Sequence, residues 1–262
     1  MKNNFEHIIS NDAKKYLAFL QFERNLANNT ITSYWMDLKF YIKYVLETYR
    51  IKKYKSIKQK HLTDYISQLS KYSSNEIEST TINRTISSIK GFHKYLINNQ
   101  VMDNDPSKNI SSLKTSQKLP SVLSYNEIEL ILSSVDEGAV NGVRDKSIIS
   151  LLYSSGLRVS ELITLNLSSL MLNENILRVV GKGDKERIVP VGVKAKLLLE
   201  NYISNYRPLY SNRGNSKGIV YLSNRGTLLS RKTVWNLIKS YSNIAGINKK
   251  VTPHTFRHSF AS

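Results

Sequence analysis

The segment from 151 to 165, LLYSSGLRVSELITL, places one arginine, Arg158, inside an otherwise apolar stretch. A guanidinium keeps its proton in proteins, so it can lie among leucines only where an anion or several hydrogen-bond acceptors meet it. Gly156 can end one helix in a left-handed conformation, and Val159 or Ser160 can begin the next. The segment therefore predicts two buried helices joined by a turn from which Arg158 projects.

Two interpretations of Arg158 stay open at this point. The guanidinium can bind a ligand anion at a rigid, accessible turn. It can also be a structural group paired with Glu161, which lies three residues on and on the same side of a helix. A short motif of this kind does not separate the two interpretations by itself.

The chain is strongly basic. Its 262 residues include 38 Lys and Arg against 20 Asp and Glu, a net charge of +18 that favours a polyanionic partner, nucleic acid first. No apolar run approaches the roughly 18 residues of a spanning helix, and the N-terminus lacks the apolar core of a secretory signal, so no membrane partner is expected. The absence of cysteine excludes disulfides and thiolate metal sites and fits a cytoplasmic protein.

Hydrophobic periodicity divides the chain into two domains. Between residues 12 and 99 the apolar side chains follow helical spacing and predict four helices, with basic residues and small hydroxyls beside them. Such residues suit phosphate and groove contacts, but a solvated helix face explains each of them equally well, so no individual DNA contact is assigned. The polar segment that follows has no apolar period and predicts a linker. The expected division is a helical domain over 1–102, a linker over 103–120 and a second domain over 121–262.

In the second domain the periodicity changes from helical to extended and back. Ser124 and Glu127 form a capping box that predicts a helix start. Two β-branched runs flank GKGDKE and predict a hairpin, and a third strand is expected over 219–222. The predicted helices cover 125–135, 144–154, 159–165, 193–205 and 230–245, and one more begins at Pro253. The expected fold class is mainly α with a small β-sheet (α+β).

Four polar residues stand at the edges of these predicted elements: Arg158, Lys182 in the hairpin turn, His254 and Arg257. His254 and Arg257 are three residues apart, so they share one face near the positive end of a helix dipole. Two arginines can hold both non-bridging oxygens of a phosphate, a lysine can protonate a departing oxygen, and a histidine can move a proton. Together they predict a phosphate site.

The stretches LYSSGLRVSELITL, VVGKGDKERIVPV and TPHTFRHSFA resemble the tyrosine site-specific recombinases, closest to the bacterial XerC/XerD group. The resemblance runs from near residue 10 to the end and includes a helical core-binding domain. It places the first catalytic arginine at Arg158, the hairpin lysine at Lys182, the HxxR pair at His254 and Arg257, and a bracing acid at Glu161. It implies metal-free transesterification through a 3′-phosphotyrosyl link, with no cofactor.

One part of the family pattern is not matched. In the family a further His or Trp and then the nucleophilic tyrosine follow HxxR by a few dozen residues, so the nucleophile is expected beyond Ser262 and the catalytic domain is expected to be incomplete at its C-terminus. His254 and His258 have the spacing of a zinc pair, but no glutamate follows His254 and no third ligand is evident, so no metal is expected.

The resemblance implies a DNA recombinase that acts as a homo- or hetero-tetramer on double-stranded DNA with short inverted-repeat sites. Chromosome dimer resolution and mobile-element integration are both compatible with it. The alternative is a catalytically inactive, truncated protein that binds recombination sites without cutting them. A general RNA-binding or architectural protein would leave Arg158, Lys182, His254 and Arg257 unexplained.

Overall fold

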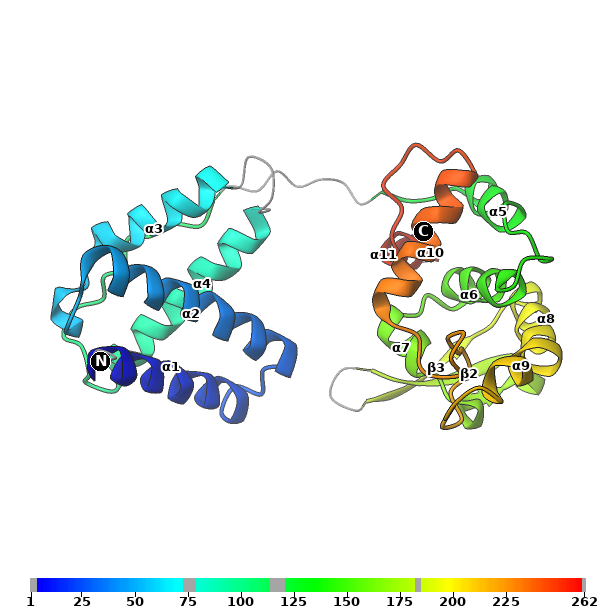
Figure 1. Ribbon diagram of the computed structural model, residues 1–262, viewed down its shortest axis with the longest axis horizontal. Helices are drawn as coiled ribbons and strands as arrows, with labels where there is room; N and C mark the ends of the chain where they lie inside the picture. Colours follow the sequence, from blue (N-terminus) through cyan, green and yellow to red (C-terminus); the bar gives the residue numbers. More distant parts are fainter. Residues whose placement is uncertain (1–3, 73–78, 114–120, 182–184, 261–262) are drawn as a thin grey trace. The chain divides into compact units, whose positions relative to one another are not determined.

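The computed structural model describes residues 4–72, 79–113, 121–181 and 185–260. The chain forms two compact units, Met1–Gln117 and Lys118–Ser262, each with its own hydrophobic core. Figure 1 shows the first unit as helices only and the second as helices with a small sheet beside them. The fold is therefore mainly α with a small β-sheet, as the sequence predicts.

In the described residues of the first unit, four α-helices form around one core, as predicted. They are α1 (Asn4–Phe22), α2 (Asn28–Tyr49), α3 (Gln59–Tyr72) and α4 (Ser79–Asn98), with a short 3₁₀ turn at Tyr54–Ser56. Apolar residues three and four apart place one face of each helix inward, and α4 buries Ile82, Ile86, Ile89 and Phe92 almost completely. A buried carboxylate also joins two helices: Asp37 on α2 accepts hydrogen bonds from both Nε and Nη2 of Arg84 on α4, at 2.9 Å each.

The first unit extends past the predicted boundary at residue 102. Ile110 is buried in its core, and the Asn83 side chain on α4 bonds both backbone groups of Leu113, at 3.0 and 2.7 Å. Residues 103–113 have the polar sequence of a linker because their attachment to this unit depends largely on hydrogen bonds to their backbone. Polar side chains of α4, Lys90 among them, make these bonds. The remaining residues of the predicted linker, 114–120, lie outside the described part of the chain.

The second unit is built around α6 (Gly142–Ser155), which is buried on nearly every side. It contacts α5 (Tyr125–Ser133), α7 (Val159–Thr164), α8 (Val193–Asn201) and α11 (Pro253–Phe260), while α10 (Arg231–Ile244) packs on α5, α7 and α11. The predicted capping box is present, since Ser124 Oγ accepts from Glu127 N at 3.3 Å and Glu127 Oε2 accepts from Ser124 N at 2.8 Å. Within the described residues, no helix is both long and apolar enough to cross a membrane.

The sheet is antiparallel in the order β1 (Leu170–Met171), β2 (Ile176–Val180) and β3 (Glu186–Pro190), with Val179 opposite Arg187. The hairpin matches the prediction, but the third strand does not. Residues 219–222 form only isolated bridges, because Val220 bonds the backbone of Leu165 and its neighbours are enclosed by the core rather than paired along a strand.

The helix predicted over 193–205 also differs in extent. It continues from α8 through a π-helical turn at Tyr202–Tyr206 into α9 (Arg207–Ser211). Tyr202 is fully buried in this turn, and its hydroxyl oxygen accepts a hydrogen bond from the backbone N of Leu222 at 3.2 Å. A π-turn adds one residue per turn and is not visible as a change in apolar period.

Candidate functional site

The turn that carries Arg158 has the predicted form. Gly156 ends α6 with a φ of +54°, Arg158 is extended, and α7 begins at Val159. A Cβ atom added to Gly156 would lie 2.6 Å from Cδ1 of Phe260, so α11 packs directly against the turn. Glycine is required here both by the left-handed backbone and by this close approach.

Arg158 is bonded to Glu161 and remains accessible. Its backbone N donates to Glu161 Oε2 and its Nη1 donates to Glu161 Oε1, both at 2.8 Å. The Glu161 side chain is only 3% exposed, whereas that of Arg158 is 47% exposed. The ion pair with Glu161 that the structural interpretation expects is therefore present. It still leaves much of the Arg158 guanidinium open to a ligand.

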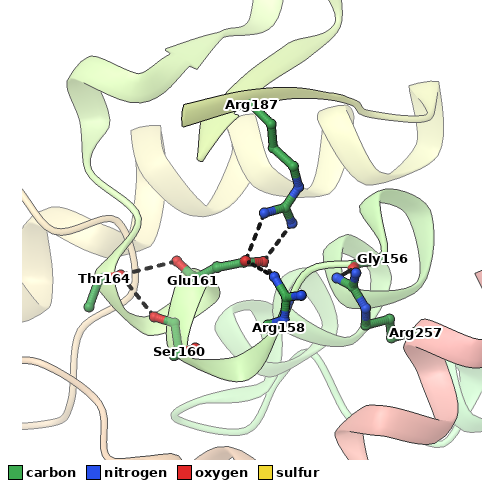
Figure 2. A network of polar contacts seen from close by, with 7 residues as sticks. All are labelled: Gly156, Arg158, Ser160, Glu161, Thr164, Arg187 and Arg257. Carbon is green, nitrogen blue, oxygen red and sulfur yellow. Dashed lines mark hydrogen bonds and ion pairs between the residues drawn. The ribbon is translucent and has the colours of Figure 1, made fainter. Parts of the chain in front are cut away.

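Arg257 approaches the same turn from α11. Its Nη1 donates to the carbonyl oxygen of Gly156, so the two arginine motifs meet at one place in the fold (Figure 2). Burial lowers the pKa of Arg257, and the positive charge of Arg158 lowers it further. Like charges in a partly buried site are relieved by an anion bound between them.

The other two predicted site residues, His254 and Lys182, are not seen at the Gly156 turn in the way that Arg158 and Arg257 are. His254 lies in the first turn of α11, three residues before Arg257, and is exposed. Lys182 lies outside the described residues. The residues on either side of its turn are bonded to each other, Gly181 N to Lys185 O at 2.8 Å. A Cβ added to Gly181 would lie 3.3 Å from Nη1 of Arg187, so the base of the hairpin reaches the arginine cluster.

Arg187 is the residue that the sequence reasoning missed. From β3 it donates Nη1 to Glu161 Oε1 and Nη2 to Glu161 Oε2, both at 2.8 Å (Figure 2). The contact spans 26 residues, so no helical or strand spacing indicates it. One signal was available: a buried carboxylate has about four acceptor positions, more than Arg158 alone can fill.

The electrostatic balance of this cluster is positive. Burial alone would raise the pKa of Glu161, but hydrogen bonds from Arg187 and then from the backbone and side chain of Arg158 lower it to about 2. Two guanidinium groups thus bond one ionised carboxylate, and a third, that of Arg257, interacts with it electrostatically. In the described ranges no group of three or more His, Asp or Glu is placed to hold a metal ion. The arrangement suits a tetrahedral oxyanion such as a phosphate.

Comparison with known proteins assigns both units to one family. Residues 121–262 match the model of the phage integrase family, and residues 13–100 match the phage integrase N-terminal SAM-like domain. Tyrosine recombinase XerD of Oceanobacillus iheyensis is 39% identical over 247 residues, which cover 94% of this chain and 82% of that protein. Tyrosine recombinase XerD of Staphylococcus aureus is 38% identical over 249 residues, covering 95% and 83%.

Solved structures agree on the fold. The XerH recombinase bound to palindromic difH substrate covers 96% of this chain and 72% of that chain, with a TM-score of 0.72 at 21% identity. A lambda integrase tetramer bound to a Holliday junction covers 96% and 68%, with a TM-score of 0.72 at 15% identity. These structures support the architecture, and the sequence matches support the kinship. The chain belongs to the phage integrase family, that of the tyrosine recombinases.

Proposed function

We propose that this protein is a site-specific DNA recombinase that cuts and rejoins double-stranded DNA through a 3′-phosphotyrosyl intermediate. The observation that carries the proposal is the meeting of Arg158 and Arg257 at the Gly156 turn, with positive charge left over after Glu161 is paired. We assign DNA binding to the helical first unit and catalysis to the second.

In the proposed reaction a tyrosine oxygen attacks the scissile phosphorus and the bond from phosphorus to the 5′ oxygen breaks. The 3′ side stays on the tyrosine, and the departing 5′ oxygen takes a proton. A 5′ hydroxyl of the partner duplex then attacks the phosphotyrosine, forms the new phosphodiester and releases the tyrosine. Arg158 and Arg257 hold the non-bridging oxygens, where negative charge grows in the transition state.

Two further residues handle protons in this scheme. We assign Lys182 as the general acid for the 5′ oxygen and His254 as a proton carrier beside the phosphate. If Lys182 has that role, a substrate with sulfur in place of the bridging 5′ oxygen should restore cleavage to Lys182→Ala, since a thiolate leaves without protonation. A variant that stays inactive on the sulfur substrate would remove Lys182 from the role.

The nucleophile remains unassigned, and we propose that it is a tyrosine beyond Ser262. Among the described tyrosines of the second unit, Tyr202 and Tyr221 are enclosed in the core, where burial raises their pKa values. Neither can reach a phosphate at the turn. The intact mass of the native gene product, with sequencing of its C-terminal peptide, would identify the tyrosine.

The partners follow by analogy with the similar structures. The XerH structure is named as bound to a palindromic substrate, and the lambda integrase structure as a tetramer on a Holliday junction. We propose that this protein likewise acts on short inverted-repeat sites as a homo- or hetero-tetramer. Chromosome dimer resolution and integration of a mobile element are the two processes it would serve.

The decisive experiment uses the full-length protein and duplexes selected by it from a random-sequence library. A selected duplex with a nick near its centre traps the covalent complex, which is counted on a denaturing gel. We expect a covalent band for the natural protein and none for Arg158→Ala or Arg257→Ala, with duplex binding retained in both variants. Binding without any covalent band in the natural protein would favour the alternative, an inactive protein that occupies sites. No selective binding would overturn both functions.

A further inference from the structure

We infer that Arg187 is a positioning residue of the phosphate site: by occupying both oxygens of Glu161, it keeps Arg158 available to the anion. The inference rests on the proposed function, since it concerns the same phosphate site. It assigns a role to a residue of the hairpin strand itself, rather than to the lysine of its turn.

The carboxylate of Glu161 is fully used. It accepts two bonds on Oε1, from Arg158 Nη1 and Arg187 Nη1, and two on Oε2, from Arg158 N and Arg187 Nη2. All four distances are 2.8 Å, and the side chain is 3% exposed. About four lone-pair positions exist on a carboxylate, so no acceptor position is left for a second bond from the Arg158 side chain.

The two arginines share this carboxylate unequally. Arg187 meets it with the paired, fork-like geometry that is the strongest arrangement between guanidinium and carboxylate. Arg158 contributes one side-chain bond, and Glu161 is the one partner of its guanidinium in the part of the chain that the structure describes. An arginine has five N–H donors, so several of those on Arg158 remain for an oxyanion.

Removing Arg187 would reverse this arrangement. The buried carboxylate would lose two charge-assisted bonds, and Arg158 is the nearest cation that could replace them. A forked pair between Arg158 and Glu161 would turn the guanidinium towards the carboxylate and cancel its charge.

Arg187 also ties the hairpin to α7. Its side chain passes beside Gly181, where an added Cβ would lie 3.3 Å from Nη1, and Gly181 stands at the end of the turn opposite Lys185. The ion pair with Glu161 therefore fixes the base of the hairpin to the helix start that carries Arg158.

The test measures binding of inorganic vanadate, a phosphate-like oxyanion, to the full chain by isothermal titration calorimetry. The variants are Arg187→Gln, Arg158→Ala and the double variant. A matched control is Arg178→Gln, which removes the same charge from the same hairpin. Within the described residues Arg178 pairs with Glu186, at 4.0 Å, and not with Glu161. If Arg187→Gln does not fold, Arg187→Lys, which keeps a cation beside the carboxylate, is compared with the control in its place.

We expect Arg187→Gln to weaken vanadate binding about tenfold, the worth of one charge-assisted bond, and Arg178→Gln to change it little. In the Arg158→Ala background the replacement of Arg187 should have almost no further effect, because the two residues act through one contact. A merely structural role would lower the melting temperature in both backgrounds without this loss of additivity.

Equal effects of Arg187→Gln and Arg178→Gln, or additive effects with Arg158→Ala, would overturn the inference while leaving the phosphate site intact. If Arg158→Ala itself binds vanadate as well as the natural chain, the phosphate site is wrong and the proposed function falls with it. Vanadate binding needs neither DNA nor the tyrosine, so the two failures are distinguishable.

Discussion

Single buried polar residues set much of the behaviour of both units. His93 of α4 is fully buried, its Nε2 lies 2.8 Å from Tyr41 Oη, and its Nδ1 has no hydrogen-bond partner among the described residues. Asp37 and Glu161 are also buried, but each is met by an arginine. A buried carboxylate with forked partners stays charged, whereas a buried imidazole without a charged partner stays neutral.

The stability of the first unit should therefore depend on pH through His93. Burial lowers the pKa of His93 from 6.5 to about 4. Between these values the unfolded chain binds a proton that the folded chain does not, so the free energy of unfolding falls as pH decreases from about 6.5 to 4. The expected loss is roughly 3 kcal/mol. Urea unfolding in a Trp235→Phe background, where Trp35 reports on the first unit, measures it.

The control is His93→Gln, which cannot titrate in this range. Its unfolding free energy should change less between pH 7 and pH 4.5 than that of the parent, whatever its absolute stability. An unchanged pH dependence would mean that carboxylates alone account for the acid sensitivity of the unit.

Gly156 should be the more sensitive of two glycines with left-handed backbones. Both Gly156 and Gly246 have positive φ, +54° and +70°, but an added Cβ meets Phe260 at the first and nothing within 4 Å at the second. The left-handed backbone alone costs an alanine roughly 1–2 kcal/mol. We expect Gly156→Ala to destabilise the second unit by more than Gly246→Ala, measured by urea unfolding with Trp235 fluorescence. Equal losses would show that Phe260 moves away without cost.

At the scale of elements, local signals in the sequence were sufficient wherever partners lie within a few residues. The capping box of α5, the Gly156 stop of α6 and the hairpin of β2 and β3 all form within such short spans. The prediction of a third strand over 219–222 was wrong because a run of β-branched and apolar residues is as typical of an enclosed core segment as of a strand. The sequence did not indicate Arg187 as a site residue, because only the fold brings it to its partner Glu161, which lies 26 residues away in the chain.

The start of α5 offers a direct test of such a local element. Ser124→Ala removes the acceptor for the backbone N of Glu127 and should cost about 1 kcal/mol of stability in the second unit. Glu127→Gln keeps an acceptor for Ser124 N and loses the ion pair with Lys249, a partly exposed contact worth less. Chemical unfolding of both variants should rank Ser124→Ala as the more damaging; the reverse order would assign the stability to the ion pair.

For the whole molecule, the dominant property is charge. A net charge of +18 spread over two units exceeds what the arginine cluster needs, so most of it is available to a polyanion. The sequence indicated this excess and the two-unit organisation, but not the true end of the first unit. Residues 103–113 are held by long-range bonds to α4, such as those of Asn83, that leave no apolar period.

If the partner is duplex DNA, its binding should be strongly dependent on salt. Each neutralised phosphate releases bound cations, so six or more contacts would lower the affinity by about a thousandfold or more between roughly 50 and 200 mM salt. Fluorescence anisotropy with a selected duplex gives the slope, and Arg158→Ala should reduce its magnitude by about one contact. A slope near zero would argue against DNA as the partner.

The contacts of the arginine cluster also differ widely in the length of chain that each one closes. Arg158 bonds Glu161 across three residues, Arg187 bonds Glu161 across 26, and Arg257 bonds Gly156 across 101. Loop closure becomes slower and more costly as separation grows, and both arginine partners of Glu161 are made well before Arg257. On the ribosome, the contact between Arg257 and Gly156 is therefore the last of the three that can form.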